Sequence, residues 1–519
     1  MASAALFSVH DKAGSVDLAR ALVASGMDIY ATGGTCTHLR EHGIPAHEVG
    51  EVTGFPALFD GRVKTLHPKI FGAILADRTK PAHVAEAAQQ GIPAISVVVV
   101  NLYPFEATVA RPGATLEEAL EQIDIGGVSL IRAAAKNYTN VTVLIDPAQY
   151  ASVIAALPAG VDGELRRQFA MRAFERTAEY DAAIARYMEA GLTANALPGS
   201  LALTIPLASR LRYGENPQSR AAFYLAREDR LPEQLWGKTL SYNNLLDLDA
   251  CLRLLVHPGI PEGYGGAADR NGTVRAAIVK HTVPCGVAEG ADAAHALSDA
   301  FNADPISAYG GIVTIDGAID FAAAERLGEY FLEIVAAPEY TSEALERLKK
   351  RKNLRIMRYK AGFPEAISAE LQVRSALGGI LAEDEDPAFA PEQWRVVSAR
   401  RPTDREWSDL LFAWNVVRHV KSNGVVIVRE GITRGICAGQ TNRVSAVRIA
   451  GERAGDYAQG GVCASDGFFP FADGLIAAVE AGCSAVVAPS GSIRDAEVVA
   501  EADRRGIALV FSTHRYFLH

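Results

Sequence analysis

The first 146 residues alternate short apolar runs with stretches of helical periodicity. The runs are continuous and bounded by turn signals, which is typical of strands buried on both faces of a parallel sheet. They are residues 5–9, 27–32, 95–100 and 141–146. Between them, residues 15–25 have helical spacing, and a Thr115-x-x-Glu118 capping box opens another helix. This order predicts a doubly wound α/β domain, whose ligands bind at the carboxyl ends of its strands.

The chain is long enough for more than one domain. It has 519 residues, 49% of them hydrophobic, which exceeds what one core usually supports. The stretch "GLTANALPGSLALTIP" is rich in Gly, Pro and small residues and has no periodicity, so we place a boundary there. We predict an N-terminal domain of residues 1–196 and a second region of residues 197–519 that holds two α/β subdomains.

Charge and composition exclude several classes of protein. The net charge is −10, with acidic and basic residues mixed along the chain, which argues against nucleic-acid binding but permits local pockets for small anions. The one dense basic run, residues 347–352, follows a helical pattern and is interpreted as a solvated helix end. The sequence has no membrane-spanning apolar stretch and no signal-peptide pattern. We expect a soluble cytoplasmic protein that binds neither membranes nor nucleic acid.

The six cysteines form no Cys-x-x-Cys pair and lie in apolar or glycine-rich contexts. This is typical of reduced thiols in a cytosolic protein. A zinc-deaminase interpretation of the sequence around Cys285 lacks the second cysteine two residues further on. We expect no metal to be required for catalysis.

A Gly-Gly pair follows the second predicted strand and opens a helix. In "ATGGTCTHL", the amides of Gly33, Gly34 and Thr35 would face outward at the helix N-terminus, which suits a phosphate. Lys12, in the loop after the first strand, adds a cation to the same corner. A Gly-Gly pair after a strand is also a common tight turn, so this feature alone leaves both interpretations open.

Four potential cations crowd a constrained loop, "GRVKTLHPK". They are Arg62, Lys64, His67 and Lys69. Such a cluster is hard to explain as structure, because loops carry function more often than fold.

Further polar groups follow at strand ends and loops. Asn101 and Tyr103 end the 95–100 strand, and Asp124 precedes a Gly-Gly break. Arg132 and Lys136 share one face of the next helix, although a solvated face explains that pair equally well. Together these segments predict a site for a phosphorylated ligand at the carboxyl edge of the sheet.

Lys280 and His281 stand side by side where a later apolar run ends, in "AAIVKHTVPCG". A histidine that ends a strand is often a satisfied core residue. The adjacent ammonium, however, favours the neutral imidazole at physiological pH, and a neutral imidazole can accept a proton. His281 is therefore a candidate general base.

The motifs "GRVKTLHP", "NLYPF" and "IDIGGVSLIRAAAKN" resemble the cyclohydrolase half of the bifunctional enzymes that carry out the last two steps of inosine monophosphate (IMP) synthesis. The resemblance implies a methylglyoxal-synthase-like domain. It also implies cyclisation of formylated aminoimidazole carboxamide ribotide (FAICAR), in which the carboxamide nitrogen attacks the formyl carbon and water leaves. Orientation and charge stabilisation can supply most of the acceleration of this intramolecular reaction.

The same resemblance implies roles for single residues. Lys64, Tyr103, Asp124 and Lys136 would surround the reacting groups, with Asp124 as the proton acceptor and the lysines stabilising oxyanion character. Arg62, Thr65 and Asn101 would orient the base, and Lys12, Gly33, Gly34 and Thr35 would hold the phosphate. His10 and Ala13 depart from the family's usual Ser and Thr, so one phosphate contact is either lost or replaced by an imidazole.

Nine ordered motifs in the second region resemble the transformylase half of the same family. They include "LRYGENPQ", "KHTVPCGVA", "KSNGVVIV", "ASDGFFPFADG" and the closing "RYFLH". The resemblance implies two cytidine-deaminase-like subdomains and transfer of a formyl group from 10-formyltetrahydrofolate to the 5-amino group of aminoimidazole carboxamide ribotide (AICAR). It also implies a homodimer with transformylase sites built across the subunit interface.

Such a weakly nucleophilic amine needs a positioned base to remove its proton. By resemblance, His281 is that base, Lys280 orients it and stabilises the tetrahedral oxyanion, and Asn423 holds the formyl oxygen. The ribotide would be bound by Arg212, Tyr213, Arg443, Arg515, Phe517 and His519, of which the arginines suit its phosphate. The folate side would be lined by Phe468, Pro470, Phe471 and Asp473.

Three departures from the family pattern fall in the second region. Gln218 stands where the family has a histidine, Val283 where it has an asparagine, and Ala472 where it has an arginine. Two alternatives to the bifunctional enzyme therefore stay open. One is an enzyme that keeps only cyclohydrolase activity, and the other is a ribotide-binding regulatory paralogue with a weakened transformylase site.

Overall fold

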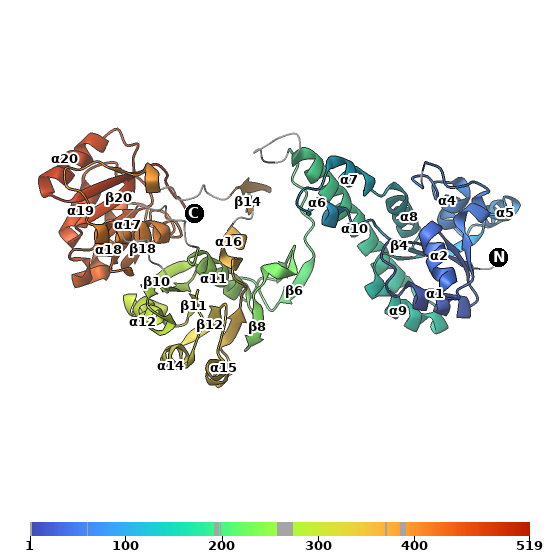
Figure 1. Cartoon of the computed structure of the whole chain (residues 1–519), viewed down its shortest axis with the longest axis horizontal. Coiled ribbons are helices and arrows are strands. Elements are labelled where there is room, and N and C mark those ends of the chain that lie inside the picture. Colours follow the sequence, from blue (N-terminus) through green and yellow to red (C-terminus); the bar gives the residue numbers. More distant parts are fainter. Residues whose placement is uncertain are drawn as a thin grey trace. The chain divides into compact units, whose positions relative to one another are not determined.

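The computed structural model describes residues 3–59, 61–190, 197, 199–256, 273–368, 371–384 and 391–519. The chain divides into two compact units, Met1–Thr204 and Ile205–His519 (Figure 1). The boundary predicted between residues 196 and 197 adjoins residues 191–196, which lie outside the described residues. In the described part of the chain, no helix combines the length and the apolar character needed to cross a membrane.

The first unit is built on a five-stranded parallel sheet in the order β3-β2-β1-β4-β5. Its strands are β1 (Ser3–Val9), β2 (Asp28–Ala31), β3 (Ala46–Glu48), β4 (Ala94–Asn101) and β5 (Thr142–Leu144). The four predicted strands are present, and only β3 is unpredicted, because this short edge strand has no apolar run. The strand order reverses between β1 and β4, and a ligand site is expected at the carboxyl ends of these two strands.

Helices connect these strands and pack on the sheet (Figure 1). They are α1 (Ser15–Ala24), α2 (Gly33–Glu41), α3 (Val49–Thr53), α4 (Pro68–Leu75), α5 (Pro81–Gln89), α6 (Phe105–Val109), α7 (Leu116–Glu121), α8 (Ile125–Lys136), α9 (Tyr150–Ala156) and α10 (Gly163–Ala190). The predicted helix over residues 15–25 is α1, and the predicted capping box of Thr115 and Glu118 begins α7. On one side of the sheet, α8 packs against α4, β4 and α10.

The second unit contains a twelve-stranded mixed sheet in the order β16-β21-β20-β19-β17-β18-β10-β9-β11-β12-β13-β8. Its strands are β8 (Glu233–Trp236), β9 (Val274–Lys280), β10 (Val283–Gly290), β11 (Gly311–Ile315), β12 (Leu332–Ala337), β13 (Arg355–Arg358), β16 (Arg395–Val396), β17 (Val425–Arg429), β18 (Ile432–Cys437), β19 (Val462–Ser465), β20 (Ala485–Pro489) and β21 (Ala508–Ser512). Two separate hairpins pair β6 (Leu207–Leu211) with β7 (Ala221–Tyr224), and β14 (Gln372–Ala376) with β15 (Gly379–Glu383).

This sheet is a topological duplication. The first repeat, residues 233–358, runs β8-α11-β9-β10-α12-α13-β11-α14-β12-α15-β13, and the second repeat, residues 395–512, runs β16-α17-β17-β18-α18-β19-α19-β20-α20-β21. Their helices are α11 (Tyr242–Arg253), α12 (Ala293–Ala303), α13 (Pro305–Ala308), α14 (Phe321–Glu329) and α15 (Ser342–Lys349), then α17 (Asp404–Val417), α18 (Arg443–Ala454), α19 (Asp473–Ala481) and α20 (Asp495–Arg505). The repeats join where β10 pairs with β18 in antiparallel orientation.

Equivalent glycines mark the duplication at the level of packing. A Cβ atom on Gly286 of β10 would lie 1.9 Å from the carbonyl oxygen of Ala300 on α12, and one on Gly435 of β18 would lie 2.0 Å from that of Ala450 on α18. Only glycine allows so close an approach of helix and strand. The two repeats therefore share a backbone requirement.

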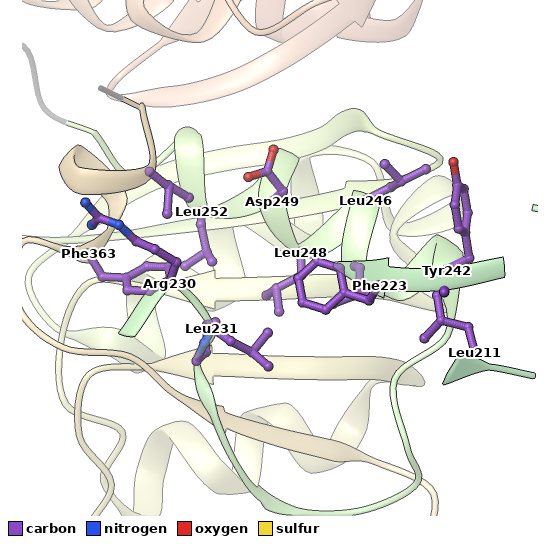
Figure 2. A pocket seen from close by; sticks show the side chains of 14 residues that line it. Leu211, Phe223, Arg230, Leu231, Tyr242, Leu246, Leu248, Asp249, Leu252 and Phe363 are labelled. Atoms are coloured by element: carbon purple, nitrogen blue, oxygen red, sulfur yellow. The ribbon is translucent and has the colours of Figure 1, made fainter. Parts of the chain in front are cut away.

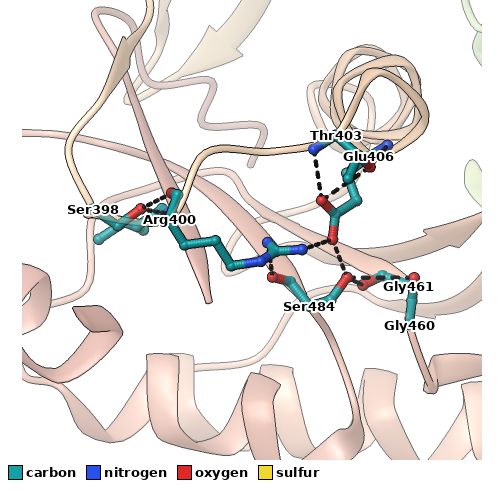
Figure 3. Close-up of polar contacts among 8 residues, drawn as sticks. Ser398, Arg400, Thr403, Glu406, Gly460, Gly461 and Ser484 are labelled. Carbon is teal, nitrogen blue, oxygen red and sulfur yellow. Dashed lines mark hydrogen bonds and ion pairs between the residues drawn. The ribbon is translucent and has the colours of Figure 1, made fainter. Parts of the chain in front are cut away.

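A buried polar cluster holds the start of α17 on the sheet (Figure 3). Glu406, which is 8% exposed, forms a capping box with Thr403, an ion pair with Arg400 and a hydrogen bond with Ser484. Burial opposes ionisation of this carboxyl, but the hydrogen bonds from Arg400 and Ser484 hold the pKa of Glu406 below its ordinary value.

Candidate active sites

In the first unit, Asn101 joins the loops that follow β1 and β4. Its Oδ1 atom accepts the backbone N–H groups of His10, at 2.5 Å, and Asp11, at 2.9 Å, and its Nδ2 atom donates to the Asp11 carbonyl at 2.7 Å. The ring of Tyr103 meets that of His10 edge-on, with centroids 5.6 Å apart. The ammonium of Lys12 lies 3.4 Å from the His10 carbonyl oxygen. The structure therefore gathers these four predicted or family-divergent side chains where the strand order reverses.

The Gly-Gly pair begins α2 beside the same loop. Gly33 and Gly34 are exposed, and their N–H groups have no intrahelical acceptor because they are the first two of the helix. Thr35 is buried, and its hydroxyl exchanges hydrogen bonds with the backbone of Val9, at 3.2 Å and 3.1 Å. Its side chain thus ties α2 to the end of β1, whereas the two glycines offer donors to a ligand.

Asp124 is the N-cap of α8. Its Oδ1 atom accepts the N–H of Gly127 at 2.6 Å, and its own N–H donates to the hydroxyl of Tyr180 on α10 at 2.9 Å. Burial raises the pKa of the Asp124 carboxyl, while the Gly127 hydrogen bond and the nearby charge of Lys64 act in the opposite direction. Thr65 lies at the same place, since a Cβ on Gly126 would be 2.9 Å from its hydroxyl oxygen.

Other predicted residues of the first unit lie apart from this group or have structural partners. Lys136 is the last residue of α8, so about 18 Å of helix separates its Cα atom from that of Asp124. Arg62 forms an ion pair with Glu121, and the guanidinium of Arg132 lies over the ring of Phe174. His67 is the N-cap of α4 and accepts the Lys69 N–H.

In the second unit, Lys280 ends β9 and His281 begins the turn to β10. His281 and Thr282 both have left-handed backbone conformations, with φ of 56° and 59°. The Lys280 ammonium donates to the Tyr309 carbonyl at 2.9 Å, and His281 is exposed. Burial raises the pKa of the neighbouring Cys285 to about 12, so this thiol is not a nucleophile at neutral pH.

Asn423 belongs to a buried network that includes Arg443 and Asp466. Arg443 donates to Asp466 and to the Oδ1 atom of Asn423, each at 2.5 Å, and the side chains of Arg443 and Asp466 are 9% and 0% exposed. Asn423 also donates to the Gln440 carbonyl at 2.7 Å. The guanidinium of Arg443 is thus engaged inside the protein, where sequence analysis assigns it to the ribotide.

The residues near the C-terminus lie against this network. The N–H of Ser422 donates to the Leu518 carbonyl at 2.8 Å, and the N–H of Tyr516 donates to the Asp466 carbonyl at 3.1 Å. A Cβ on Gly467 would lie 2.6 Å from Arg443 and 2.8 Å from the ring of Phe517. These contacts place Phe517 and its neighbours beside Asn423.

The remaining predicted residues are exposed or half-buried. Arg212 stacks on Tyr213, and Arg515 stacks on Phe517, with guanidinium-to-centroid distances of 4.7 Å and 4.5 Å. The other exposed members are Phe468, Pro470, Phe471, Asp473 and His519. Arg494 lies 4.8 Å from the Phe471 centroid, and sequence analysis does not predict it. Among the departures, Gln218 is exposed, Val283 is half-buried in β10, and Ala472 is buried at the N-cap of α19.

The transformylase residues fall into two groups at one edge of the sheet. Successive pairing of β9, β10, β18 and β17 is antiparallel, so β9 ends at Lys280 on the edge where β17 begins after Asn423. β19 and β21 end on this edge too, which brings residues 466–473 and 513–519 to it. Three strand spacings, about 14 Å, separate β9 from β17. Lys280 and His281 therefore form one group at this edge, and Asn423 with the residues after β19 and β21 forms the other.

An apolar cavity of about 300 Å³ lies between the β6–β7 hairpin, α11 and α16 (Phe363–Ser368) (Figure 2). Leu211, Phe223, Leu248 and Phe363 are among its lining residues. None of the residues assigned to either reaction lines it.

Known families match nearly the whole chain. The family described as the AICARFT/IMPCHase bienzyme matches residues 134–453, and the MGS-like domain matches residues 14–129. Three relatives share the name bifunctional purine biosynthesis protein PurH. The chain is 47% identical to that of Prochlorococcus marinus (strain MIT 9303) over 100% of both chains. It is 48% identical to that of Chloroflexus aurantiacus over 99% of this chain and 98% of the relative, and 45% identical to that of Desulfitobacterium hafniense (strain DSM 10664 / DCB-2) over 99% of each.

Proposed function

The chain belongs to the family of bifunctional AICAR transformylase and IMP cyclohydrolase enzymes of purine biosynthesis, and from this membership we propose how its residues divide the two reactions. The enzyme formylates AICAR to FAICAR with a formyl-folate donor and then cyclises FAICAR to IMP with loss of water. We assign cyclisation to the edge of the first unit where β1 and β4 end, and formyl transfer to the edge of the second unit where β9 ends and β17 begins. The donor is 10-formyltetrahydrofolate.

Cyclisation centres on Asp124 and Lys64. The Asp124 carboxylate takes the proton that the carboxamide nitrogen loses as it attacks the formyl carbon. The Lys64 ammonium stabilises the negative charge that develops on the formyl oxygen. This oxygen then leaves as water with the proton that Asp124 took and the proton of the former formamide N–H, and the C=N bond of the new ring forms. The observation that supports this assignment is the raised pKa of a carboxyl that is half-buried beside a lysine, since such a carboxylate is a stronger base than an exposed one.

The loops around this pair hold the ribotide. Gly33 and Gly34 offer N–H groups and Lys12 offers a cation to the phosphate. Thr65 and Arg62 orient the base, for which Arg62 has to leave its ion pair with Glu121, and Tyr103 lies beside the reacting groups. His10 replaces the family's serine beside Tyr103. Asn101 and Thr35 act through the backbone of the β1 loop, because their side chains bond to it.

The role of Lys136 in this site rests on the resemblance alone. A ribotide is long enough to extend along part of α8, but one reacting group does not reach both of its ends. Replacing Lys64 by Met should lower kcat for cyclisation, whereas the same change at Lys136 should act mainly on KM. Equal losses of kcat would place Lys136 at the reacting atoms and contradict this division.

Formyl transfer centres on His281. The AICAR amine attacks the formyl carbon of the folate while the imidazole of His281 takes the amine proton, and this proton then moves to the folate nitrogen as its bond to the formyl carbon breaks. Lys280 and Asn423 stabilise the oxyanion of the tetrahedral intermediate. Arg212, Tyr213, Arg515, Phe517 and His519 bind the ribotide, with Arg443 ordering Asn423 from within, and Phe468, Pro470, Phe471 and Asp473 line the folate side.

Separate assays of purified protein test the assignment. His281→Ala should lower formyl transfer by at least about a hundredfold and leave cyclisation of FAICAR unchanged. Asp124→Asn should do the reverse. Formyl transfer that survives His281→Ala would remove the assignment of the base, and failure of the parent protein to formylate AICAR would favour the cyclohydrolase-only alternative.

The transformylase site is completed by a second copy of the chain. About 14 Å of sheet separates the strand that carries His281 from the strand that follows Asn423, which is too far for both to contact one formyl group. In addition, the β14–β15 hairpin exposes Val373, Ile380 and Leu381, and an isolated hairpin of this kind is marginal unless it packs on something. These observations support a homodimer in which each site uses both subunits.

Mixing two inactive variants tests this arrangement. Heterodimers of His281→Ala and Asn423→Ala chains contain one site with neither substitution if the site spans the interface. Mixing should therefore restore formyl transfer to about a quarter of the parent activity. No recovery, in a mixture that exchanges subunits, would place both residues in one protomer's site. Leu381→Asp should weaken the dimer in sedimentation experiments, whereas Val84→Asp, an exposed change on α5, should not.

We propose AICAR, FAICAR and the folate as the substrates of the two sites. Three expectations stay predictions: a cytoplasmic location, no metal requirement, and no binding to membranes or nucleic acid. The activity of a chelator-treated sample, with and without added divalent cations, tests the metal requirement.

A further inference from the structure

The turn that presents His281 is strained by its own sequence. Both His281 and Thr282 have positive φ, and neither is a glycine. Left-handed backbone is unfavourable for any residue with a Cβ atom, and a β-branched residue such as Thr282 is least suited to it. Some contact must hold this turn in its conformation.

Asp247 of α11 supplies that contact. Its Oδ1 atom accepts the N–H of Thr282 at 2.6 Å, and the carboxylate also faces the N–H of His281. Asp247 is half-buried, and α11 packs against β9 and β10. The carboxylate is therefore fixed by the helix and in turn fixes the backbone of the turn.

The second repeat contains the same device without a catalytic residue. There the turn between β17 and β18 consists of Glu430 and Gly431, with φ of 64° and 69°. Their N–H groups donate to Asp409 of α17 at 2.9 Å and 2.8 Å. The one difference in backbone chemistry is that the second position of this turn is a glycine, which tolerates positive φ without strain.

We propose that Asp247 is a positioning residue for formyl transfer, which holds the strained turn of His281 and Thr282 so that the imidazole meets the AICAR amine. This inference rests on the proposed role of His281 as the base. Because the first repeat has Thr282 where the second has Gly431, its turn depends on the aspartate anchor more than the turn of the second repeat does. A relaxed turn displaces the imidazole, and a displacement of about 1 Å costs about a hundredfold in rate.

Alanine variants of the two anchors provide a matched pair. Asp247→Ala should lower kcat for formyl transfer by at least about tenfold and change KM for AICAR by less than about threefold. Cyclisation by the same protein should be unchanged. Asp409→Ala removes the equivalent contact from a turn without catalytic residues and should leave kcat for formyl transfer within about twofold of the parent. Equal losses of kcat in the two variants would overturn the proposal, because the anchor would then be only a fold element.

A glycine in the turn provides the rescue. Adding Thr282→Gly to Asp247→Ala introduces the glycine that the second repeat has at this position and relieves the strain, so kcat should recover toward the parent value. A double variant that regains thermal stability without regaining kcat would contradict the proposal. If Asp247→Ala does not fold, Asp247→Asn answers the same question, because its amide oxygen still accepts the Thr282 N–H and kcat should stay within a few-fold of the parent. A large loss of kcat in folded Asp247→Asn would overturn the role of the hydrogen bond.

His281→Ala separates this proposal from the assignment of the base. In the His281→Ala background, Asp247→Ala should cause no further loss of formyl transfer, since there is no imidazole left to position. A further loss would show that Asp247 acts on something else. Full activity of His281→Ala alone would instead remove the proposed base and leave the geometry of the turn as it is.

Discussion

The side-chain amide of Asn101 and the backbone of Asp11 form a closed, two-way hydrogen-bonded pair. Oδ1 accepts the Asp11 N–H at 2.9 Å, and Nδ2 donates to the Asp11 carbonyl at 2.7 Å. Asn101 ends β4 and Asp11 follows β1, so the pair fixes the loop that carries Lys12 at the point where the strand order reverses. One amide therefore fixes the loop that we propose binds the ribotide phosphate.

Asn101→Ala should release this loop. Each lost hydrogen bond is worth about 0.5–1.5 kcal/mol, so kcat/KM for cyclisation should fall by about tenfold or more, mainly through KM for FAICAR. Steady-state kinetics of both reactions measure the effect, and formyl transfer by the same sample is the internal control. Asn101→Asp keeps the acceptor and loses the donor, so its kcat/KM for cyclisation should lie between those of the parent and Asn101→Ala. A loss confined to kcat would contradict a role in binding.

The decrease of kcat/KM for cyclisation at acidic pH should follow the protonation of Asp124. Burial raises the pKa of its carboxyl, and the base must be ionised to act, so kcat/KM should fall on acidification with a midpoint above the ordinary value of about 3.9 for an aspartate. The Lys64 charge lowers that pKa. Lys64→Met should therefore move the midpoint of this decrease to higher pH as well as reduce the rate. An unchanged midpoint in Lys64→Met would show that another group titrates.

Sequence patterns predict the strands of the first unit because buried strands depend on local signals. The apolar runs of the first unit are its buried strands, and the end of one such run places Lys280 and His281 at the edge of the second sheet. The sequence does not show how far apart two residues lie in the folded protein. The resemblance implies that Asp124 and Lys136 surround the same reacting groups, but the two residues stand at opposite ends of α8.

The residue roles that sequence patterns do not predict depend on tertiary contacts. The resemblance implies that Arg443 binds the ribotide, but the residue has a buried partner, Asp466, which follows β19. Asp247 stands in "NNLLDLDAC", where a second aspartate and a helical spacing give no reason to connect it with His281. The equivalence with Asp409 becomes visible only when the two repeats are aligned by their strands, because turns and close glycine contacts are shared while most side chains differ.

The pair of Arg443 and Asp466 should dominate the stability of the second unit. Both side chains are buried, and Asp466 also accepts the Ser422 hydroxyl and the Gly424 N–H. Removing one partner of a buried ion pair leaves an uncompensated charge and costs about 3–5 kcal/mol. Asp466→Ala should lower the free energy of unfolding by that amount and impair formyl transfer, because Arg443 holds Asn423.

Urea denaturation followed by tryptophan fluorescence measures this loss, since all four tryptophans, at positions 236, 394, 407 and 414, lie in the second unit. Asp229→Ala is the matched control, because the pair of Asp229 with Arg227 is on the surface. Exposed pairs contribute about 0–1 kcal/mol. Similar decreases in the free energy of unfolding in the two variants would show that burial does not make the Arg443–Asp466 pair more important than an exposed pair.

The stability of the second unit should fall in acid partly through Glu406. Its pKa is lower in the folded protein than the ordinary value of 4.5, so the stabilisation is fully present above about that pH and is lost as the pH falls through the folded-state pKa. Glu406→Gln removes the charge that pairs with Arg400, and it should lower the free energy of unfolding at pH 7 by about 1–3 kcal/mol and flatten its decline between pH 5 and 3. Glu329→Gln, which breaks the exposed pair with Arg326, should leave the curve nearly unchanged. An unchanged acid decline in Glu406→Gln would mean that other carboxylates carry it, and the cluster of Figure 3 would then only position the start of α17.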